Sequence, residues 1–362
     1  MYVLVSPLDQ RSADIRFFDA DGVQIDKKSE RKLENLFFRE DFRRAAFYEM
    51  GSIEHAEPIA AYRERLLSTV DADAIRAARF RVLIDYDYSA ASAILPDVLN
   101  ELGVTTIPLN AGISEGPFHR EVTDETALIT KTVRADVGVK INATGESLIL
   151  IDDDGVVLNS HEAFAVLARW RLAEGPGLIV APATTPQWLV NMVESSGGAF
   201  APTKSDPPSL LRAATGQDVR LASDGDGGFV WPRHLAAFDA MYTIVKLLEL
   251  RALRDETLAY ARQELPWTPY ITTTEFCPWE RKGRVMRVLL EEHRGRNIDL
   301  SDGIKVFVES GFVLVRPDPD APAYHIVVSV SDEDAGRQLL EEYVSRVREA
   351  QGEHEAHAAE LL

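Results

Sequence analysis

Two segments of the chain follow the same order of elements: a short apolar strand, a loop, and an amphipathic helix that ends at glycine. The first runs from residue 79 to 103, with its strand at 82–84, and the second begins at Leu178. Strands that alternate with helices are typical of parallel sheets covered by helices. This order restricts the chain to an α/β architecture, and its recurrence indicates repeated domains of one kind.

From about Thr268 the pattern changes. We expect a strand at 270–274, a hairpin at 304–315 and a long helix from Ser331, which together indicate an α+β domain. A helix is also expected over 235–253. With 362 residues the chain exceeds a single typical core. The predicted fold class is therefore α/β, with consecutive domains that have mixed sheets and a C-terminal α+β domain.

Composition excludes several classes of function. The formal net charge of −19 argues against nucleic acid, which requires clustered Lys and Arg. No apolar run approaches the roughly 20 residues of a membrane span. The single cysteine, Cys277, cannot form an intrachain disulfide, which fits a reducing cytoplasm, and we expect it to be a core residue.

Residues 135–152 read as a buried strand, a loop at 142–147, a second strand at 148–151 and an acidic turn. By spacing, this stretch resembles the metal loop of the phosphohexomutases, the phosphomannomutase and phosphoglucomutase superfamily, with the pattern D-x-G-x-x-x-D-G-D-x-D-R. Asp136 and Gly138 match its first two positions. The three metal-binding aspartates fall on Asn142, Thr144 and Glu146, and the arginine falls on Ser147.

Three further segments resemble motifs of that superfamily in the same order. Ser6 falls on the nucleophilic serine of the phosphoserine loop when Arg16 and Phe17 set the register. Asp224 and Asp226 fall on the glutamate and serine of the sugar loop. Arg316 and Pro317 match the phosphate loop, whose next four residues are replaced by Asp318, Pro319, Asp320 and Ala321. Without the resemblance, residues 224–227 also read as part of a calcium loop, but the ligand at the twelfth position is absent and a turn is favoured.

The replaced residues weaken the chemistry that the resemblance implies. Magnesium prefers several carboxylates and bound water, so Glu146 with neutral oxygens from Asn142 and Thr144 would bind it weakly. A like charge 4 Å away costs about 4 kcal/mol at an effective dielectric of about 20. Asp318 and Asp320 are therefore expected to outweigh Arg316 in the phosphate loop.

The resemblance implies four domains, the first of them a truncated phosphohexomutase domain. The expected boundaries are 1–78, 79–173 with the metal loop, 174–264 with the sugar loop, and 265–362 with the phosphate loop. A first domain of this kind would expose sheet edge and core, so we expect a second chain or an N-terminal portion to cover it.

The leading hypothesis is a catalytically silent phosphohexomutase-like module of sugar-phosphate and sugar-nucleotide metabolism. Such modules occur C-terminal to nucleotidyltransferase domains of the mannose-1-phosphate guanylyltransferase type, so the implied partner is such a domain. The alternative is an active sugar-phosphate mutase that uses Ser6, a reduced magnesium site and Arg316 on a hexose phosphate. A binding protein for a neutral or cationic sugar derivative would also fit the acidic loops.

Overall fold

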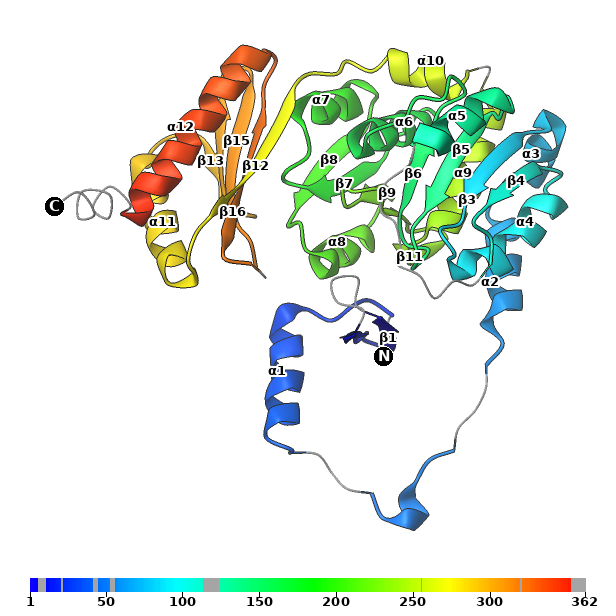
Figure 1. Ribbon diagram of the computed structural model, residues 1–362, viewed down its shortest axis with the longest axis horizontal. Helices are drawn as coiled ribbons and strands as arrows, with labels where there is room; N and C mark the ends of the chain where they lie inside the picture. Colours follow the sequence, from blue (N-terminus) through cyan, green and yellow to red (C-terminus); the bar gives the residue numbers. More distant parts are fainter. Residues whose placement is uncertain are drawn as a thin grey trace.

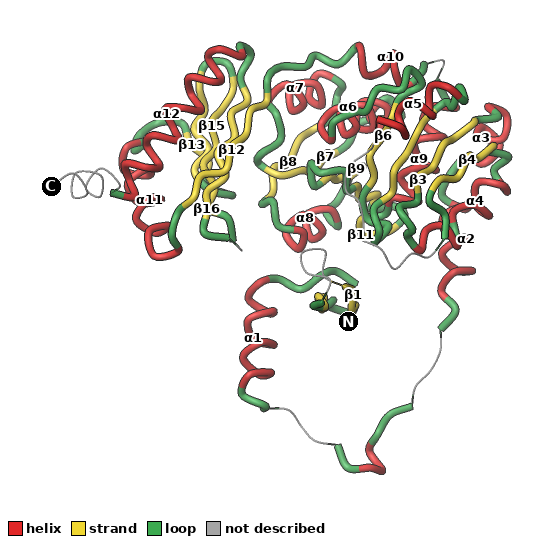
Figure 2. The backbone as a smooth tube through the Cα atoms, viewed as in Figure 1, coloured by secondary structure: helices red, strands yellow, loops and turns green. Residues whose placement is uncertain are grey.

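The computed structural model describes residues 1–5, 11–20, 22–41, 45–52, 56–112, 124–254, 256–319 and 321–352, which form four sheets (Figures 1 and 2). The large sheets formed by residues 81–151 and 178–238 lie side by side, and the third large sheet, formed by residues 270–329, lies beside the second. The predicted α/β class with mixed sheets and a C-terminal α+β part is confirmed. The domain boundaries stay a prediction.

A four-stranded sheet has the order β4-β3-β5-β6, in which β3 is parallel to β4 and β5, and β6 is antiparallel to β5. The strands expected at 82–84 and 148–151 are present, and so is the loop expected at 142–147. The elements of this part are β3 (Arg81–Asp85), η2 (Ala90–Ala93), α4 (Leu95–Glu101), β4 (Thr105–Leu109), α5 (Asp124–Thr132), β5 (Val137–Ile141), β6 (Leu148–Ile151) and α6 (Ser160–Leu172).

A five-stranded sheet has the order β11-β10-β9-β7-β8, with β7 parallel to β8 and β9. Its elements are β7 (Leu178–Pro182), α7 (Gln187–Ser195), β8 (Ala199–Thr203), α8 (Pro207–Ala214), β9 (Val219–Ser223), β10 (Phe229–Trp231), β11 (Leu235–Phe238), α9 (Ala240–Ala252) and α10 (Leu258–Gln263). The predicted helix over 235–253 is wrong at its start, because residues 235–238 pair with β10 as strand β11. The helix begins after Asp239, whose side chain caps it by accepting a hydrogen bond from the Tyr242 backbone N–H.

The third large sheet is antiparallel, with the order β12-β16-β15-β14-β13, and packs against α11 and α12. The expected hairpin and C-terminal helix are confirmed. Cys277, which is in no disulfide, is fully buried in the core of this part, as predicted. The elements are β12 (Tyr270–Phe276), α11 (Trp279–Glu292), β13 (Ile298–Asp299), β14 (Ile304–Val308), β15 (Gly311–Pro317), β16 (Ala323–Ser329) and α12 (Glu333–Gln351).

The N-terminal part consists of a two-stranded sheet and helices, of which α1 lies outside the main body (Figure 1). None of the residues of α1 is buried. Among the helices described, none combines the length and the apolar character that a bilayer span requires. The elements are β1 (Tyr2–Val5), β2 (Ala13–Arg16), α1 (Lys27–Phe38), η1 (Phe47–Glu49), α2 (Pro58–Ser68) and α3 (Ala72–Ala78).

One continuous apolar core joins the first two large sheets. It extends from Leu66 on α2 to Leu265 and includes most of α6 and α9. A separate core lies under the third sheet. The metal-loop and sugar-loop segments are therefore carried by one packed body.

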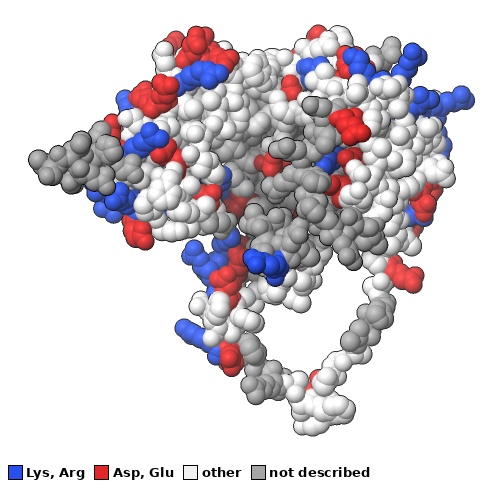
Figure 3. All heavy atoms as spheres, viewed as in Figure 1, with Lys and Arg blue, Asp and Glu red and all other residues white. Residues whose placement is uncertain are grey.

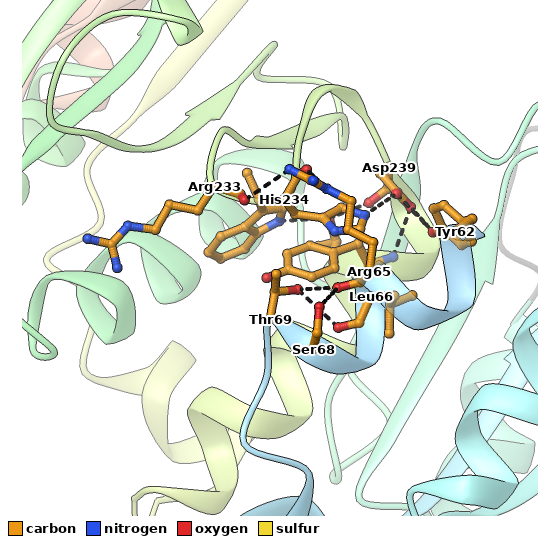
Figure 4. Close-up of polar contacts among 11 residues, drawn as sticks. Tyr62, Arg65, Leu66, Ser68, Thr69, Arg233, His234 and Asp239 are labelled. Atoms are coloured by element: carbon orange, nitrogen blue, oxygen red, sulfur yellow. Dashed lines mark hydrogen bonds and ion pairs between the residues drawn. The ribbon is translucent and has the colours of Figure 1, made fainter. Parts of the chain in front are cut away.

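A polar cluster attaches α2 to this body (Figure 4). The Tyr62 hydroxyl donates to both carboxylate oxygens of Asp239, at 2.9 and 3.0 Å, and the Arg65 side chain donates to the backbone carbonyls of Arg233 and His234. Asp239 is buried, so its carboxylate needs the hydrogen bonds that the Tyr62 hydroxyl and the Tyr242 backbone N–H donate to it.

We predict that Asp239→Ala lowers the free energy of unfolding by about 2–4 kcal/mol, because it removes both a helix cap and the acceptor of Tyr62. Asp71→Ala is the matched control, since Asp71 caps α3 through the Ala74 backbone N–H alone, and should cost about 1 kcal/mol. Urea unfolding monitored by circular dichroism measures both. Equal losses would show that the bond from Tyr62 contributes nothing.

Candidate functional site

The loop between β5 and β6 uses its own side-chain oxygens to hold its shape. The Asn142 Oδ1 accepts from the backbone N–H groups of Glu146 and Ser147, at 2.9 and 3.1 Å. The Thr144 hydroxyl donates to the Glu146 Oε2 at 3.0 Å. Two of the three predicted metal ligands are thus engaged inside the loop.

The third predicted ligand, Glu146, binds a cation that the chain itself supplies. Arg16, on β2, places its Nη1 2.8 Å from Oε1 and 3.0 Å from Oε2 of Glu146. Among the described residues there is no group of three or more His, Cys, Asp or Glu that could hold a metal ion. The donor set is one carboxylate already paired with a guanidinium, which does not fit magnesium.

The sugar-loop segment is folded around Asp224. Its Oδ1 accepts from the backbone N–H groups of Asp226 and Gly228, at 2.8 and 2.9 Å. Burial nevertheless raises the pKa of Asp224 to about 6. Asp224 therefore acts in the geometry of the loop, whereas the Asp226 side chain is exposed.

The two loops meet directly. The Leu148 backbone N–H donates to the Gly227 carbonyl at 3.0 Å, and Ser147 and Gly228 form an isolated β-bridge. Gly227 has a φ of +87°, and a Cβ there would lie 2.5 Å from the Leu148 carbonyl oxygen. Glycine at 227 is thus required for this close approach.

Arg316, at the end of β15, lines a cavity of about 730 Å³ that we call the basic pocket. Within the part of the chain that the structure describes, five cationic side chains line it, and they come from four elements or loops. Figure 3 shows Lys and Arg side chains at the end of α1 that approaches the rest of the molecule. The five are Lys27, Lys28, Lys204, Arg287 and Arg316.

Among the described residues, three acidic side chains line the basic pocket, and each is engaged. Asp26 and Asp206 cap α1 and α8 through the backbone N–H groups of Ser29 and Ser209. Asp302 accepts from the Ser205 hydroxyl at 2.6 Å and lies 3.9 Å from the Arg316 Nη1. The buried Arg316 Nε has no hydrogen-bond partner among the described residues.

Asp318 is not among the residues that line the basic pocket. Its Oδ2 lies 2.7 Å from the His325 Nε2, and its Oδ1 accepts from the Ala321 backbone N–H at 2.8 Å. The carboxylate is directed to partners on β16 and within its own turn. The repulsion expected from Asp318 is therefore reduced, while Asp320 and Ser6 lie outside the described residues.

The predicted site residues divide into two groups. The loops that carry Glu146 and Asp226 are joined, whereas Arg316 belongs to the basic pocket. Sequence reasoning did not identify Lys204 as a partner of Arg316. A usable signal existed, because Lys204 directly follows β8 at the carboxyl end of a parallel strand, where α/β proteins place ligand-binding groups.

Comparisons with known proteins agree with the fold. No family model matches the chain. It is 29% identical over 345 residues to a phosphoglucomutase/phosphomannomutase of Thermococcus kodakarensis, which covers 93% of this chain and 75% of that protein. It is 26% identical over 346 residues to a probable phosphoglucosamine mutase of Methanopyrus kandleri, over 92% of this chain and 75% of that protein.

Solved structures give the same result for the fold. A phosphoglucomutase/phosphomannomutase family protein from Burkholderia thailandensis superposes with a TM-score of 0.76 at 17% identity, over 91% of this chain and 71% of that chain. An Aspergillus fumigatus N-acetylphosphoglucosamine mutase solved in complex with GlcNAc-6P and magnesium superposes with a TM-score of 0.54 at 11% identity, over 80% of this chain and 69% of that chain. The relatives and structural neighbours of this chain are thus phosphoglucomutases, phosphomannomutases and phosphoglucosamine mutases, members of the alpha-D-phosphohexomutase superfamily.

Proposed function

We propose that this chain is a phosphohexomutase-like module that binds a hexose phosphate but does not catalyse magnesium-dependent phosphoryl transfer. The observation that carries the proposal is the pairing of Glu146 with Arg16. It leaves the metal loop without a free carboxylate.

Phosphoryl transfer between sugar hydroxyls needs a cation that neutralises charge developing on the phosphoryl group. A divalent ion with open coordination positions does this in a metal loop. The Arg16 guanidinium carries one charge and has both Glu146 oxygens as acceptors. A magnesium ion would have to displace it and would then find one carboxylate and two neutral oxygens.

The basic pocket supports binding of a phosphorylated ligand. Its five cations face three carboxylates that are already engaged. Arg316 can offer its unpartnered N–H to a phosphate oxygen, and such charge-assisted bonds are stronger than neutral ones.

A protein partner is supported by apolar side chains on α1 and in and around η1. They are between 37% and 89% exposed, and they comprise Leu33, Leu36, Phe37, Phe38, Phe47, Tyr48 and Met50. Large apolar side chains exposed on a helix that has no buried residue are typical of interaction sites. We propose that a nucleotidyltransferase domain of the mannose-1-phosphate guanylyltransferase type covers this surface, so that the module acts by interaction or regulation in sugar-nucleotide metabolism.

The second candidate is an active sugar-phosphate mutase with Ser6 as nucleophile. It is favoured by the basic pocket and by the activities named for the relatives. It requires a route to charge neutralisation other than the metal loop. Arg16 is a cation that already contacts that loop.

We predict that the wild-type protein shows no more turnover than Ser6→Ala in a coupled mutase assay. The assay uses mannose 1-phosphate and glucose 1-phosphate with magnesium and a hexose bisphosphate activator. Isothermal titration should likewise show no saturable magnesium binding below about 10 mM, because one paired carboxylate is a poor site. Magnesium-dependent turnover that disappears in Ser6→Ala would establish the active mutase instead.

Binding of glucose 1-phosphate should weaken about tenfold in Lys204→Ala or Arg316→Ala, since each removes one charge-assisted hydrogen bond. Arg337→Ala is the control, because Arg337 is an exposed residue of α12 that pairs with Glu333. Isothermal titration at two salt concentrations measures the affinities. Unchanged affinity in both pocket variants would place the ligand elsewhere.

The partner proposal predicts that the chain co-elutes with a guanylyltransferase domain in size-exclusion chromatography. Phe37→Asp with Phe47→Asp should abolish co-elution, because burying a charge in an apolar interface is costly. Leu128→Asp, a change at a 65% exposed residue of α5, should not. Separate elution of the unaltered proteins would refute this partner.

A further inference from the structure

A cavity of about 340 Å³, which we call the arginine pocket, lies at the edge of the second large sheet where β9 begins. Its walls come from the residues after α8, the start of β9, the turn between β10 and β11, and β11. The parallel strands β7, β8 and β9 all begin at this edge. The sugar loop and Lys204 follow the other ends of β9 and β8, so the arginine pocket is on the opposite side of the sheet.

Helix α8 separates the arginine pocket from the basic pocket. Asp206 and Ser209 at its start line the basic pocket, whereas Thr215 after its end lines the arginine pocket. Eight residues of α-helix span about 12 Å. The two cavities share no lining residue, so they are separate sites.

Two guanidinium groups line the arginine pocket, from Arg220 on β9 and Arg233 in the turn between β10 and β11. Among the described residues, the Arg233 side chain has no hydrogen bond or ion pair. Figure 4 shows it directed away from the cluster around Asp239. Arg220 donates only its Nε, to the Pro176 carbonyl at 3.1 Å. Both arginines thus keep N–H groups that an oxyanion can accept from.

The Arg220 side chain is held in place before any ligand binds. It crosses directly over Gly177, because a Cβ at that glycine would lie 2.2 Å from the Arg220 Cγ and 2.5 Å from its Nε. The bond from Nε to Pro176 fixes the direction of the guanidinium. Binding costs less free energy when the contacting groups are already ordered.

Positive charges converge at this pocket, although the chain as a whole carries a net charge of −19. Arg171 on α6 lies behind it and pairs with Glu174 at 2.9 Å. Burial lowers the pKa of Arg171, Glu174 opposes this, and the charges of Arg220 and Arg233 lower the pKa further. Since Glu174 is engaged with Arg171, the repulsion among the three arginines is left for an anion to offset.

One carboxylate lines the arginine pocket within the described part of the chain, from Asp218. It forms no ion pair with either pocket arginine among those residues. The two guanidinium groups therefore remain available, and the lining carries a net charge of one positive unit. Asp218 limits how much negative charge the pocket favours.

We propose that the arginine pocket binds the phosphate group of a small ligand. A guanidinium presents parallel N–H groups that match two oxygens of a phosphate, and such charge-assisted pairs are the strong ones. The volume is at the lower end of the range of about 300–1,000 Å³ that small-molecule sites occupy. A neutral ligand would leave the repulsion between the arginines in place.

Isothermal titration with inorganic phosphate at constant ionic strength tests the proposal. The full chain carries Lys204→Ala and Arg316→Ala, which weaken any binding at the basic pocket and keep this test separate from the proposed function. We expect saturable binding in the low-millimolar range, about tenfold weaker when Arg220→Ala or Arg233→Ala is added. Arg294→Ala is the matched control, because Arg294 is exposed after α11 and lines neither pocket.

Two further variants in the same background test charge and geometry. Asp218→Asn removes the like charge and should strengthen phosphate binding about threefold. Gly177→Ala keeps both arginines but displaces the Arg220 side chain, and it should weaken binding about threefold. Circular dichroism confirms that each variant is folded.

Three outcomes would overturn the proposal. The first is no saturation up to about 100 mM phosphate, which is beyond millimolar affinity. The second is equal affinity in Arg233→Ala and Arg294→Ala, which would place the phosphate elsewhere. The third is chloride binding as tightly as phosphate, which would show an adventitious ion only.

Discussion

The burial of α6 is the constraint on which the arrangement of the site depends. Nine of the thirteen residues of this helix are buried, and eight of them, including Phe164 and Trp170, belong to the core that joins the first two large sheets. A helix that is apolar on most of its circumference must be enclosed on several sides. Because the helix is enclosed, the loop after β5 and the loop after β9 are held against each other, and the bond from Leu148 to Gly227 can form.

The pairing of Arg16 with Glu146 has a different importance. Both side chains are about one-third exposed, and such pairs contribute only about 0–1 kcal/mol to stability. The pair matters for metal binding instead, because it occupies the carboxylate that a metal ion in this loop would need. Asn142 and Thr144 reinforce this by directing their oxygens into the loop.

Two cavities separate the chemistry that the loops were expected to share. Arg316 retains its place at the end of β15 and gains cations from α1, α11 and the residue after β8. Asp226 instead lines a separate cavity with His161, Trp267 and Tyr270. The described residues of the two loops thus line two cavities rather than one.

The sequence by itself determined the local elements. The periodicity of apolar residues located β3, β4, β5, β6 and the C-terminal hairpin, since a strand or helix pattern is a property of neighbouring residues. It failed at 235–238, where apolar residues before the capping Asp239 pair with β10 rather than continue the helix. The spacing of motif residues also singled out Arg316 and the loop that carries Glu146.

Only the tertiary structure decided what those residues contact. Arg16 and Glu146 are 130 positions apart, and the basic pocket combines Lys27 with Lys204 and Arg316. No local pattern encodes such pairs, because they depend on how separate sheets pack. The same holds for the hydrogen bond from Tyr62 to Asp239, since these two residues are 177 positions apart.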